Sequence, residues 1–242
     1  MILGRVKYIL VITCLIFSSG CATTASTSGY DASDPMQGVN RVTFAFNDAV
    51  DAVLFKPLAK GYNTVVPDPV DTAVSNFFSN LREIDSAVNN LFQGKFNLAA
   101  NDIGRFAINS TFGVGGLIDI ASDMGMQKTG EDFGQTLGYY GANSGAYLVL
   151  PIIGSNSMRD LPGTAISMVL NPLAWLDDVS LRNQLVGTNA VDTRSDLLAK
   201  EEIAEEISKD KYTLYRNSYL DERDFAVNDG KMDASDIEKD LE

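Results

Sequence analysis

Histidine is absent from the 242-residue sequence, and cysteine occurs only twice. Without histidine, the chain lacks the commonest general base, the usual nitrogen ligand of zinc and the central residue of a Ser-His-Asp triad. Cys14 lies in an N-terminal apolar run that we expect to be removed, so Cys21 would be the only thiol of the mature chain. An intrachain disulfide and a cysteine-ligated metal are thereby excluded, and the sequence predicts no metal site.

Nucleotide-binding and hydrolase signatures are also missing. The glycines at 113, 115 and 116 do not complete G-x-G-x-x-G, because Ile118 occupies its last position, and G-x-x-x-x-G-K-[ST] occurs nowhere in the chain. In GANSG (141–145) the serine stands fourth instead of third, with no histidine to activate it. We expect Glu131 and Asp132 to cap the helix that follows them. The sequence therefore predicts a protein that is not an enzyme and needs no cofactor.

The N-terminus has the features of an export signal. Arg5 and Lys7 precede an apolar run at 8–17, which is shorter than the roughly 20 residues that span a bilayer. Ser-Ser-Gly-Cys then resembles a bacterial lipobox, with serine at 18 in place of the usual leucine. We expect residues 1–20 to be a lipoprotein signal peptide, Cys21 to be acylated and residues 21–33 to form a flexible tether. The alternative is ordinary cleavage that leaves a free thiol.

Acidic residues dominate the charge. The chain has 19 basic and 32 acidic residues, and removing residues 1–20 takes away two basic ones, for a net charge of −15 (17 − 32). This balance repels phosphate backbones and predicts no nucleic-acid partner. Much of the acid lies near the C-terminus, where we expect residues 226–242 to be an acidic, disordered tail.

Helical periodicity organises most of the mature chain. Asp34-Pro35 and Asp68-Pro69 each place a carboxylate where it would cap a helix whose first turn holds the proline. Apolar residues then recur at steps of three and four, and a third such stripe follows Gly94. We expect most of these stripes to pack in the core: Met36, Val39, Val42, Phe46, Val50 and Val53; Val70, Val74, Phe77, Phe78, Ile84, Val88, Leu91 and Phe92; Phe96, Ala100, Ile103, Ala107 and Phe112. Phe44, Phe46, Phe77 and Phe78 are equally candidates for membrane contact.

The middle of the chain differs from these helices. Tyr147–Ile153 is a strongly apolar run whose β-branched residues and Pro151 favour a short strand or hairpin arm. We expect Ser155 or Asn156 to cap another helix, which Asn171-Pro172 would end. Ile203, Ile207, Leu214 and Tyr215 indicate further helix. The predicted fold is mostly α, in one domain at 34–225, with a short apolar hairpin or extended segment.

Six stretches resemble the VacJ/MlaA family of outer-membrane lipoproteins, over about residues 34–223. They are DPMQGVNR (34–41), FNDAVDAVLFKPLAKGY (46–62), SNFFSNLREI (75–84), RFAINSTFGVGGLIDIA (105–121), DFGQTLGYYG (132–141) and YLVLPIIGSNSMRD (147–160). The chain departs from the family where it has alanine at 146, serine at 155 and lysine at 211 in place of proline. The first two departures are expected to loosen the hairpin.

The resemblance implies a ring-like helical bundle that lies in one leaflet of the outer membrane. Through an amphipathic channel, such a protein removes mislocalised phospholipids from the outer leaflet and passes them to a periplasmic phospholipid-carrier protein, which maintains lipid asymmetry. It also implies trimeric porins as partners and an N-terminal lipid anchor on the periplasmic side. The alternative is a structural envelope lipoprotein that scaffolds porins without transporting lipid.

Two segments are the candidates for the channel wall, since glycine lets a ligand approach the backbone closely. For single residues, packing or capping is the competing interpretation. Asp119 and Gln135 are the candidates for head-group contact. The predicted channel-lining residues are Gly113, Gly115, Gly116, Leu117, Ile118, Asp119, Phe133, Gly134, Gln135, Leu137 and Tyr140.

Overall fold

A computed structural model describes residues 34–231 of the chain. The predicted signal peptide, Cys21, the tether and all of the tail beyond residue 231 lie outside the described residues. Fourteen-residue α2 (Gln37–Val50) leads into a π-helical turn, η1 (Asp51–Phe55), and then into α3 (Lys56–Val65). Pro57 has no N–H and crowds the carbonyl four residues before it, so the wider π turn lets the helix continue past it.

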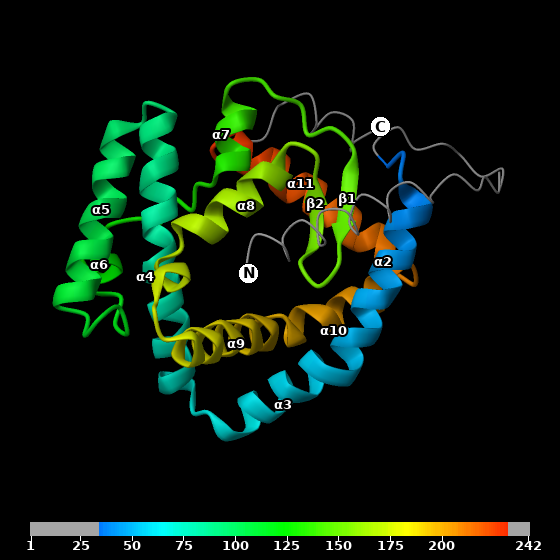
Figure 1. Ribbon diagram of the computed structural model, residues 1–242, viewed down its shortest axis with the longest axis horizontal. Helices are drawn as coiled ribbons and strands as arrows, with labels where there is room; N and C mark the ends of the chain where they lie inside the picture. The colour runs from blue at the N-terminus through cyan, green and yellow to red at the C-terminus, as the bar shows by residue number, and fades with distance from the viewer. Residues whose placement is uncertain (1–33, 232–242) are drawn as a thin grey trace, which may run out of the picture. The chain divides into compact units, whose positions relative to one another are not determined.

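Helices α4 (Asp68–Phe92) and α5 (Phe96–Thr111) form an adjacent pair (Figure 1). Gly94, with φ of 74°, provides the left-handed turn between them. Pro69 lies in the first turn of α4, as predicted. Neither aspartate caps its helix: α4 begins at Asp68 itself, and the Asp34 carboxylate is occupied by the side chain of Asn40. The Asp34 carboxylate also contacts Tyr212 and Arg216, far along the chain, so tertiary contacts take the place of the expected cap.

A short helix, α6 (Ile120–Asp123), follows the glycine-rich segment, and α7 (Phe133–Tyr139) follows next. The predicted hairpin is present: β1 (Tyr147–Leu150) pairs antiparallel with β2 (Gly154–Ser157), with Tyr147 opposite Ser157. The prediction that Ser155 or Asn156 caps a helix is wrong, because both residues belong to β2. Helix α8 (Asp160–Leu170) begins later, where the Ser157 hydroxyl accepts a hydrogen bond from the Asp160 N–H at 3.1 Å.

Asn171-Pro172 ends α8 as predicted and begins a 3-10 turn, η2 (Pro172–Trp175). Three helices complete the described chain: α9 (Val179–Asp196), α10 (Leu198–Ile207) and α11 (Lys211–Val227). Helix α9 contacts α4, α10 connects α9 to α11, and α11 contacts α7, which contacts α4 in turn (Figure 1). These contacts close a circuit of helices, as a ring-like bundle requires. None of the helices between residues 34 and 231 is both long and apolar enough to cross a membrane.

The expectation that the apolar stripes pack in the core is wrong for many of their members. Val42 is 72% exposed and Val53 is 81% exposed, whereas the buried residue of α2 is Asn40. In α5 the predicted stripe is likewise outside, and the buried positions are Ala99, Asp102, Arg105 and Asn109. Phe78 is buried, but Phe46 is half exposed. The amphipathic helices therefore turn their polar faces inward, the reverse of a water-soluble protein.

Candidate functional site

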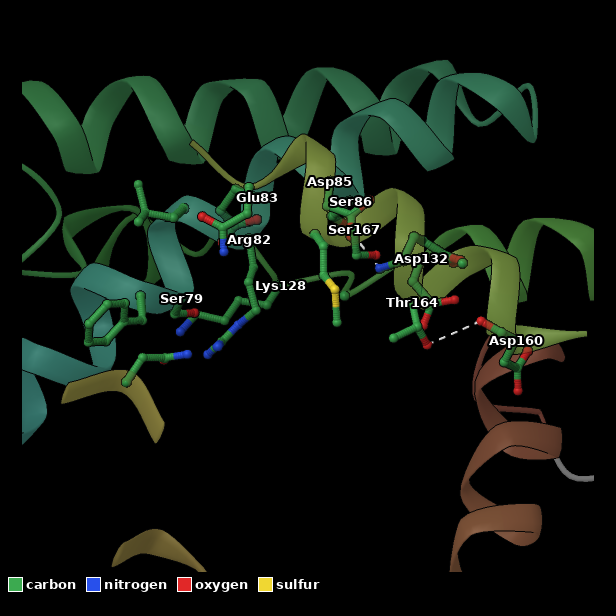
Figure 2. Close-up of a pocket in the computed structure, with 18 of the residues that line it drawn as sticks. Ser79, Arg82, Glu83, Asp85, Ser86, Lys128, Asp132, Asp160, Thr164 and Ser167 are labelled. Atoms are coloured by element: carbon green, nitrogen blue, oxygen red, sulfur yellow. Dashed lines mark hydrogen bonds between the residues drawn. The ribbon is translucent and has the colours of Figure 1, made fainter. Parts of the chain in front are cut away.

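A cavity of about 640 Å³ lies between α4, α8 and the segment before α7, with β2, α9 and α11 also contributing to its wall. Its volume is in the range of pockets that hold small molecules. The residues that line it are largely polar or charged. Figure 2 shows Arg82 and Lys128 toward one side of the cavity, Asp85 in the middle, and Asp132 and Asp160 toward the other side.

The α4 wall of the cavity rests on a buried polar layer shared with α5. The Asp102 carboxylate of α5 accepts hydrogen bonds from the Ser86 hydroxyl at 2.9 Å, the Asn90 amide at 2.8 Å and the Thr129 hydroxyl at 2.8 Å. Ser86, Asn90 and Asp102 are at most 2% exposed. Because buried polar groups are costly unless bonded, this layer fixes how α4 and α5 pack together.

Arg105, fully buried on α5, joins α4 to the glycine-rich segment. Its Nε lies 2.7 Å from Glu83 Oε1, and its Nη2 lies 3.0 Å from both Asp119 oxygens. Burial raises the pKa of Asp119, but hydrogen bonds from Ser122 and Asn109 outweigh it and hold that pKa well below its usual range. Glu83, in contrast, has a raised pKa because its burial outweighs the bond from Arg105. The Asp119 carboxylate is therefore used in hydrogen bonds that fix the glycine-rich segment in place.

A second ion-paired cluster joins α7, α8 and α11 at the other side. The Arg223 guanidinium contacts Asp132 at 2.6 Å and Asp160 at 3.0 Å. Asp160 also accepts from the Tyr219 hydroxyl at 2.7 Å and from Arg159 Nε at 2.8 Å. Burial raises the pKa of Asp160, but these bonds and the Arg223 charge outweigh it and hold the pKa well below its usual range.

Between the clusters, several polar groups that line the cavity have no partner of opposite charge. Within residues 34–231, Arg82 forms no ion pair, and Asp85 has no cationic partner. Burial raises the pKa of Asp85, as does the charge of Asp132, while hydrogen bonds with Ser167 and Asn89 lower it. The buried side-chain oxygen of Asn189 on α9 accepts no hydrogen bond in the described part of the chain. The cavity wall therefore presents a cation at Arg82 and an anion at Asp85 that have no ion-pair partner among the described residues, and an unused hydrogen-bond acceptor at Asn189.

The predicted glycine-rich segment lies outside this cavity. Gly113 packs against the Asn109 backbone, and a Cβ on Gly116, whose φ is +95°, would lie 2.7 Å from Asn80 Nδ2. Gly115 is exposed, and Leu117 and Ile118 are 39% and 52% exposed. Among the described residues that line the cavity, none comes from the predicted 113–119 segment. Tight packing, the competing interpretation, accounts for Gly113 and Gly116.

The second predicted segment, residues 133–140, packs against residues that line the cavity. A Cβ on Gly134 would collide with Asp160 and Arg223, and Phe133 contacts Phe92 edge to face. Gln135 is buried and donates to the Gly130 carbonyl at 2.9 Å. Leu137 is half-buried, and the exposed Tyr140 donates from its hydroxyl to the Phe92 carbonyl at 2.6 Å. None of these residues is part of the cavity wall as the structure describes it.

Asp132 caps α7 by accepting from the Gln135 N–H at 2.9 Å, which confirms half of the capping prediction. Glu131 is instead buried and bound to Gln93 at 2.8 Å and to Lys95 at 3.2 Å. The wall residues of α4 were missed by the sequence analysis. Two of them, Glu83 and Ser86, belong to a polar stripe at helical spacing that continues through Asn80 and Asn90, which are buried but do not line the cavity. This polar stripe, opposite an apolar one, is the signal in the sequence.

The molecule has polar, ion-paired side chains around a cavity and apolar side chains on its outside, and these two features define its class of protein. This is a helical, membrane-associated protein built around a polar cavity.

Comparison with known proteins agrees with that class. Residues 32–226 match the family described as MlaA lipoprotein. The chain is 34% identical over 220 residues to the intermembrane phospholipid transport system lipoprotein MlaA of Haemophilus influenzae, covering 88% of this chain and 87% of the relative. It is 33% identical over 218 residues to the Escherichia coli K12 protein of the same description, covering 88% and 85%.

A solved structure described as the structural basis for maintenance of bacterial outer membrane lipid asymmetry aligns with a TM-score of 0.70 at 32% identity. The alignment covers 81% of this chain and 99% of that one. The chain belongs to the MlaA lipoprotein family. Membership confirms the predicted family and helical fold, the outer-membrane location and the prediction of a non-enzymatic protein.

Proposed function

We infer that this chain is the lipoprotein of an intermembrane phospholipid transport system that maintains outer-membrane lipid asymmetry, and we propose that lipid head groups pass through the cavity between α4 and α8. The observation that carries the proposal is the inverted polarity of the helices. Apolar side chains face outward, where lipid tails would contact them, while charged side chains line a cavity large enough for a head group.

The energetics favour a route in which the tails never meet water. Exposing two acyl chains of about 30 methylenes in total would cost on the order of 20 kcal/mol, at about 0.8 kcal/mol for each methylene. An apolar exterior set within one leaflet replaces bilayer contacts with protein contacts as the lipid moves. Acylation of Cys21 would hold the protein at the membrane through this process. No covalent chemistry on the lipid is required.

The partners belong to the proposal as well. A soluble periplasmic carrier would receive the phospholipid, and trimeric porins would be neighbours in the membrane. The acidic helix α10 and the end of α11, which expose Glu202, Asp221 and Asp224, are the candidate face for the carrier. Charge complementarity would then set the rate of association with it.

Filling the cavity tests this function. Ser79→Trp and Met168→Trp each place a large ring on the cavity wall, and Ser180→Trp places the same ring at an exposed position on α9, outside it. Each variant is expressed as the only copy of the gene, and phospholipid on the cell surface is measured by labelling. We expect both cavity variants to raise surface phospholipid to the level of a deletion strain, with Ser180→Trp unchanged.

Protein level in the membrane fraction is measured for every variant in the same cells. Normal surface phospholipid in both cavity variants would contradict transport through the cavity. Normal surface phospholipid in the deletion strain would favour the structural lipoprotein that only scaffolds porins.

A further inference from the structure

Two opposite charges lie without ion-pair partners on one face of α4, within the cavity. Arg82 and Asp85 are three residues apart, so their side chains project from consecutive turns on the same side of the helix. Both line the cavity, and in the described part of the chain neither forms an ion pair with the other or with any other group. The six other charged residues of the wall that the structure describes are all paired: Glu83, Lys128, Glu131, Asp132, Asp160 and Arg223.

We propose that Arg82 and Asp85 recognise a zwitterionic phospholipid head group, with Arg82 on the phosphate and Asp85 on a primary ammonium such as that of ethanolamine. The inference rests on the proposed function and names the head group that the cavity selects. The head group carries its two charges a short linker apart, and the protein presents the complementary pair one helical turn apart.

Asp85 is held in a position suited to an ammonium group. Its carboxylate is fixed by hydrogen bonds with the Asn89 amide at 2.8 Å and with Ser167 across the cavity on α8. Burial and the nearby charge of Asp132 disfavour its ionised form, which raises its pKa, and a bound cation would relieve both effects. A primary ammonium also donates hydrogen bonds, and Asn189 offers a buried acceptor on the same cavity wall.

Arg82 is suited to the phosphate. Its planar guanidinium presents donors in a fork that matches two phosphate oxygens, and Lys128, already paired with Asp119 at 3.2 Å, adds positive potential beside it. Figure 2 shows both cations on the side of the cavity away from Asp132 and Asp160. An anionic glycerol head group would satisfy Arg82 but leave the Asp85 carboxylate without a counter-charge. The pair therefore favours the ethanolamine lipid over the glycerol lipid.

Lipid binding to the purified full-length protein tests the pair. The ligands are dihexanoyl phosphatidylethanolamine, dihexanoyl phosphatidylglycerol and free phosphoethanolamine, each competing with a fluorescent phospholipid. We expect wild type to favour the ethanolamine lipid over the glycerol lipid on the order of tenfold, as one charge-assisted hydrogen bond allows. Asp85→Asn should bring this ratio close to one, and Arg82→Gln should weaken both lipids by a similar factor.

Matched controls are Asp177→Asn, just before α9, and Arg182→Gln on α9, which make the same side-chain changes outside the cavity wall; both should keep the wild-type affinities and ratio. Equal wild-type affinity for the two lipids overturns the inference, whether or not the variants fold. An Asp85→Asn protein that binds lipid with the wild-type ratio overturns it as well.

The remaining outcomes separate the inference from the proposed function. Free phosphoethanolamine that binds as tightly as the lipid would assign the pair to a soluble compound and overturn the lipid assignment. If neither lipid displaces the fluorescent phospholipid from wild type, the proposed function itself fails. Binding of both lipids with equal strength leaves the proposed function intact and removes only the head-group selection.

Discussion

The side chain of Asn40 on α2 forms hydrogen bonds with the backbone of Tyr147 in β1 and with that of Val149, two residues further on. Its Nδ2 donates to the Tyr147 carbonyl at 2.8 Å, and its Oδ1 accepts from the Val149 N–H at 3.0 Å. Asn47, two turns along α2, repeats the pattern with Leu150 at 2.9 Å and Ile152 at 2.8 Å. In the sheet that the structure describes, β1 pairs only with β2, so these asparagines occupy its other edge.

Replacing Asn40 by leucine should destabilise the protein. Asn40 is 2% exposed, and the substitution leaves a buried carbonyl and a buried N–H without partners. At about 1–3 kcal/mol for each of the two unpaired groups, we expect a loss of about 2–6 kcal/mol in the free energy of unfolding. Thermal unfolding followed by circular dichroism measures it. Asn63→Leu, at an exposed position on α3, is the control, and equal melting temperatures for the two variants would contradict the role given to Asn40.

The helices were predictable because their signals are local, whereas the direction in which each face points is not. The spacing of Val39, Val42 and Phe46 reveals an amphipathic helix, but it does not show whether water or lipid lies outside. Asn40 and Tyr147 are 107 residues apart, so nothing near Asn40 shows that its partner is a strand. Asp34 illustrates the same point, since its expected role as a cap is replaced by contacts across the fold with Tyr212 and Arg216.

The residues predicted to line a channel do not line this cavity, for a related reason. Glycine-rich sequence signals close approach, but it does not distinguish approach to a ligand from approach to another helix. Gly134 on α7 packs directly against Gly163 on α8, so the absence of a side chain at these positions allows the two helices to approach closely. The cavity wall is formed instead by polar positions of α4 and α8, which look like surface positions in the sequence.

Gly163→Ala should therefore destabilise the contact between α7 and α8. A Cβ on Gly163 would lie 2.7 Å from the Gly134 backbone nitrogen, and a backbone atom cannot rotate away. We expect a loss of about 1–3 kcal/mol, the range for overpacking. Gly187→Ala is the matched control, because nothing lies within 4 Å of its added methyl group on α9. The control should be neutral or stabilise the protein by up to about 1 kcal/mol. A Gly163→Ala protein as stable as the control would show that α7 and α8 can move apart to accept the methyl group at no cost.

Stability should fall at acidic pH through the cluster around Asp160. Its folded-state pKa lies below the unfolded value of about 3.9, so its contribution is complete above that pH and is lost as the pH falls. The groups that face Asp160 are Arg159, Tyr219, Arg223 and Asp132. The pKa of Asp132 is also lowered: burial raises it, but the hydrogen bonds and the charge of Arg223 outweigh burial.

Melting temperatures between about pH 7 and about pH 3 test this cluster. Asp160→Asn should melt lower than wild type at pH 7, and the gap should narrow as the pH falls below about 4. Asp221→Asn, at an exposed position on α11, should keep the wild-type slope. A gap between Asp160→Asn and wild type that stays constant over the whole range would show that the Asp160 charge contributes nothing.

Lysines placed on the outer face of α2 and the following turn should weaken membrane binding. Val42 and Val53 are 72% and 81% exposed, which in water would make lysine harmless there. Within a leaflet the same lysines lose apolar contact and bring charge toward the hydrocarbon. The effect is measured in a Cys21→Ser background, which removes the proposed anchor, as the fraction of protein released from membranes by a carbonate wash.

We expect Val42→Lys with Val53→Lys to release most of the protein, while Cys21→Ser alone releases less because the apolar surface still holds it. Ser180→Lys with Ser218→Lys adds the same two charges at exposed polar positions and should match Cys21→Ser alone. Since both pairs change the net charge equally, a difference between them can arise only from where the lysines lie. Equal release by the two pairs would mean that water, not lipid, covers the valines, and the inverted polarity of the helices would then need another explanation.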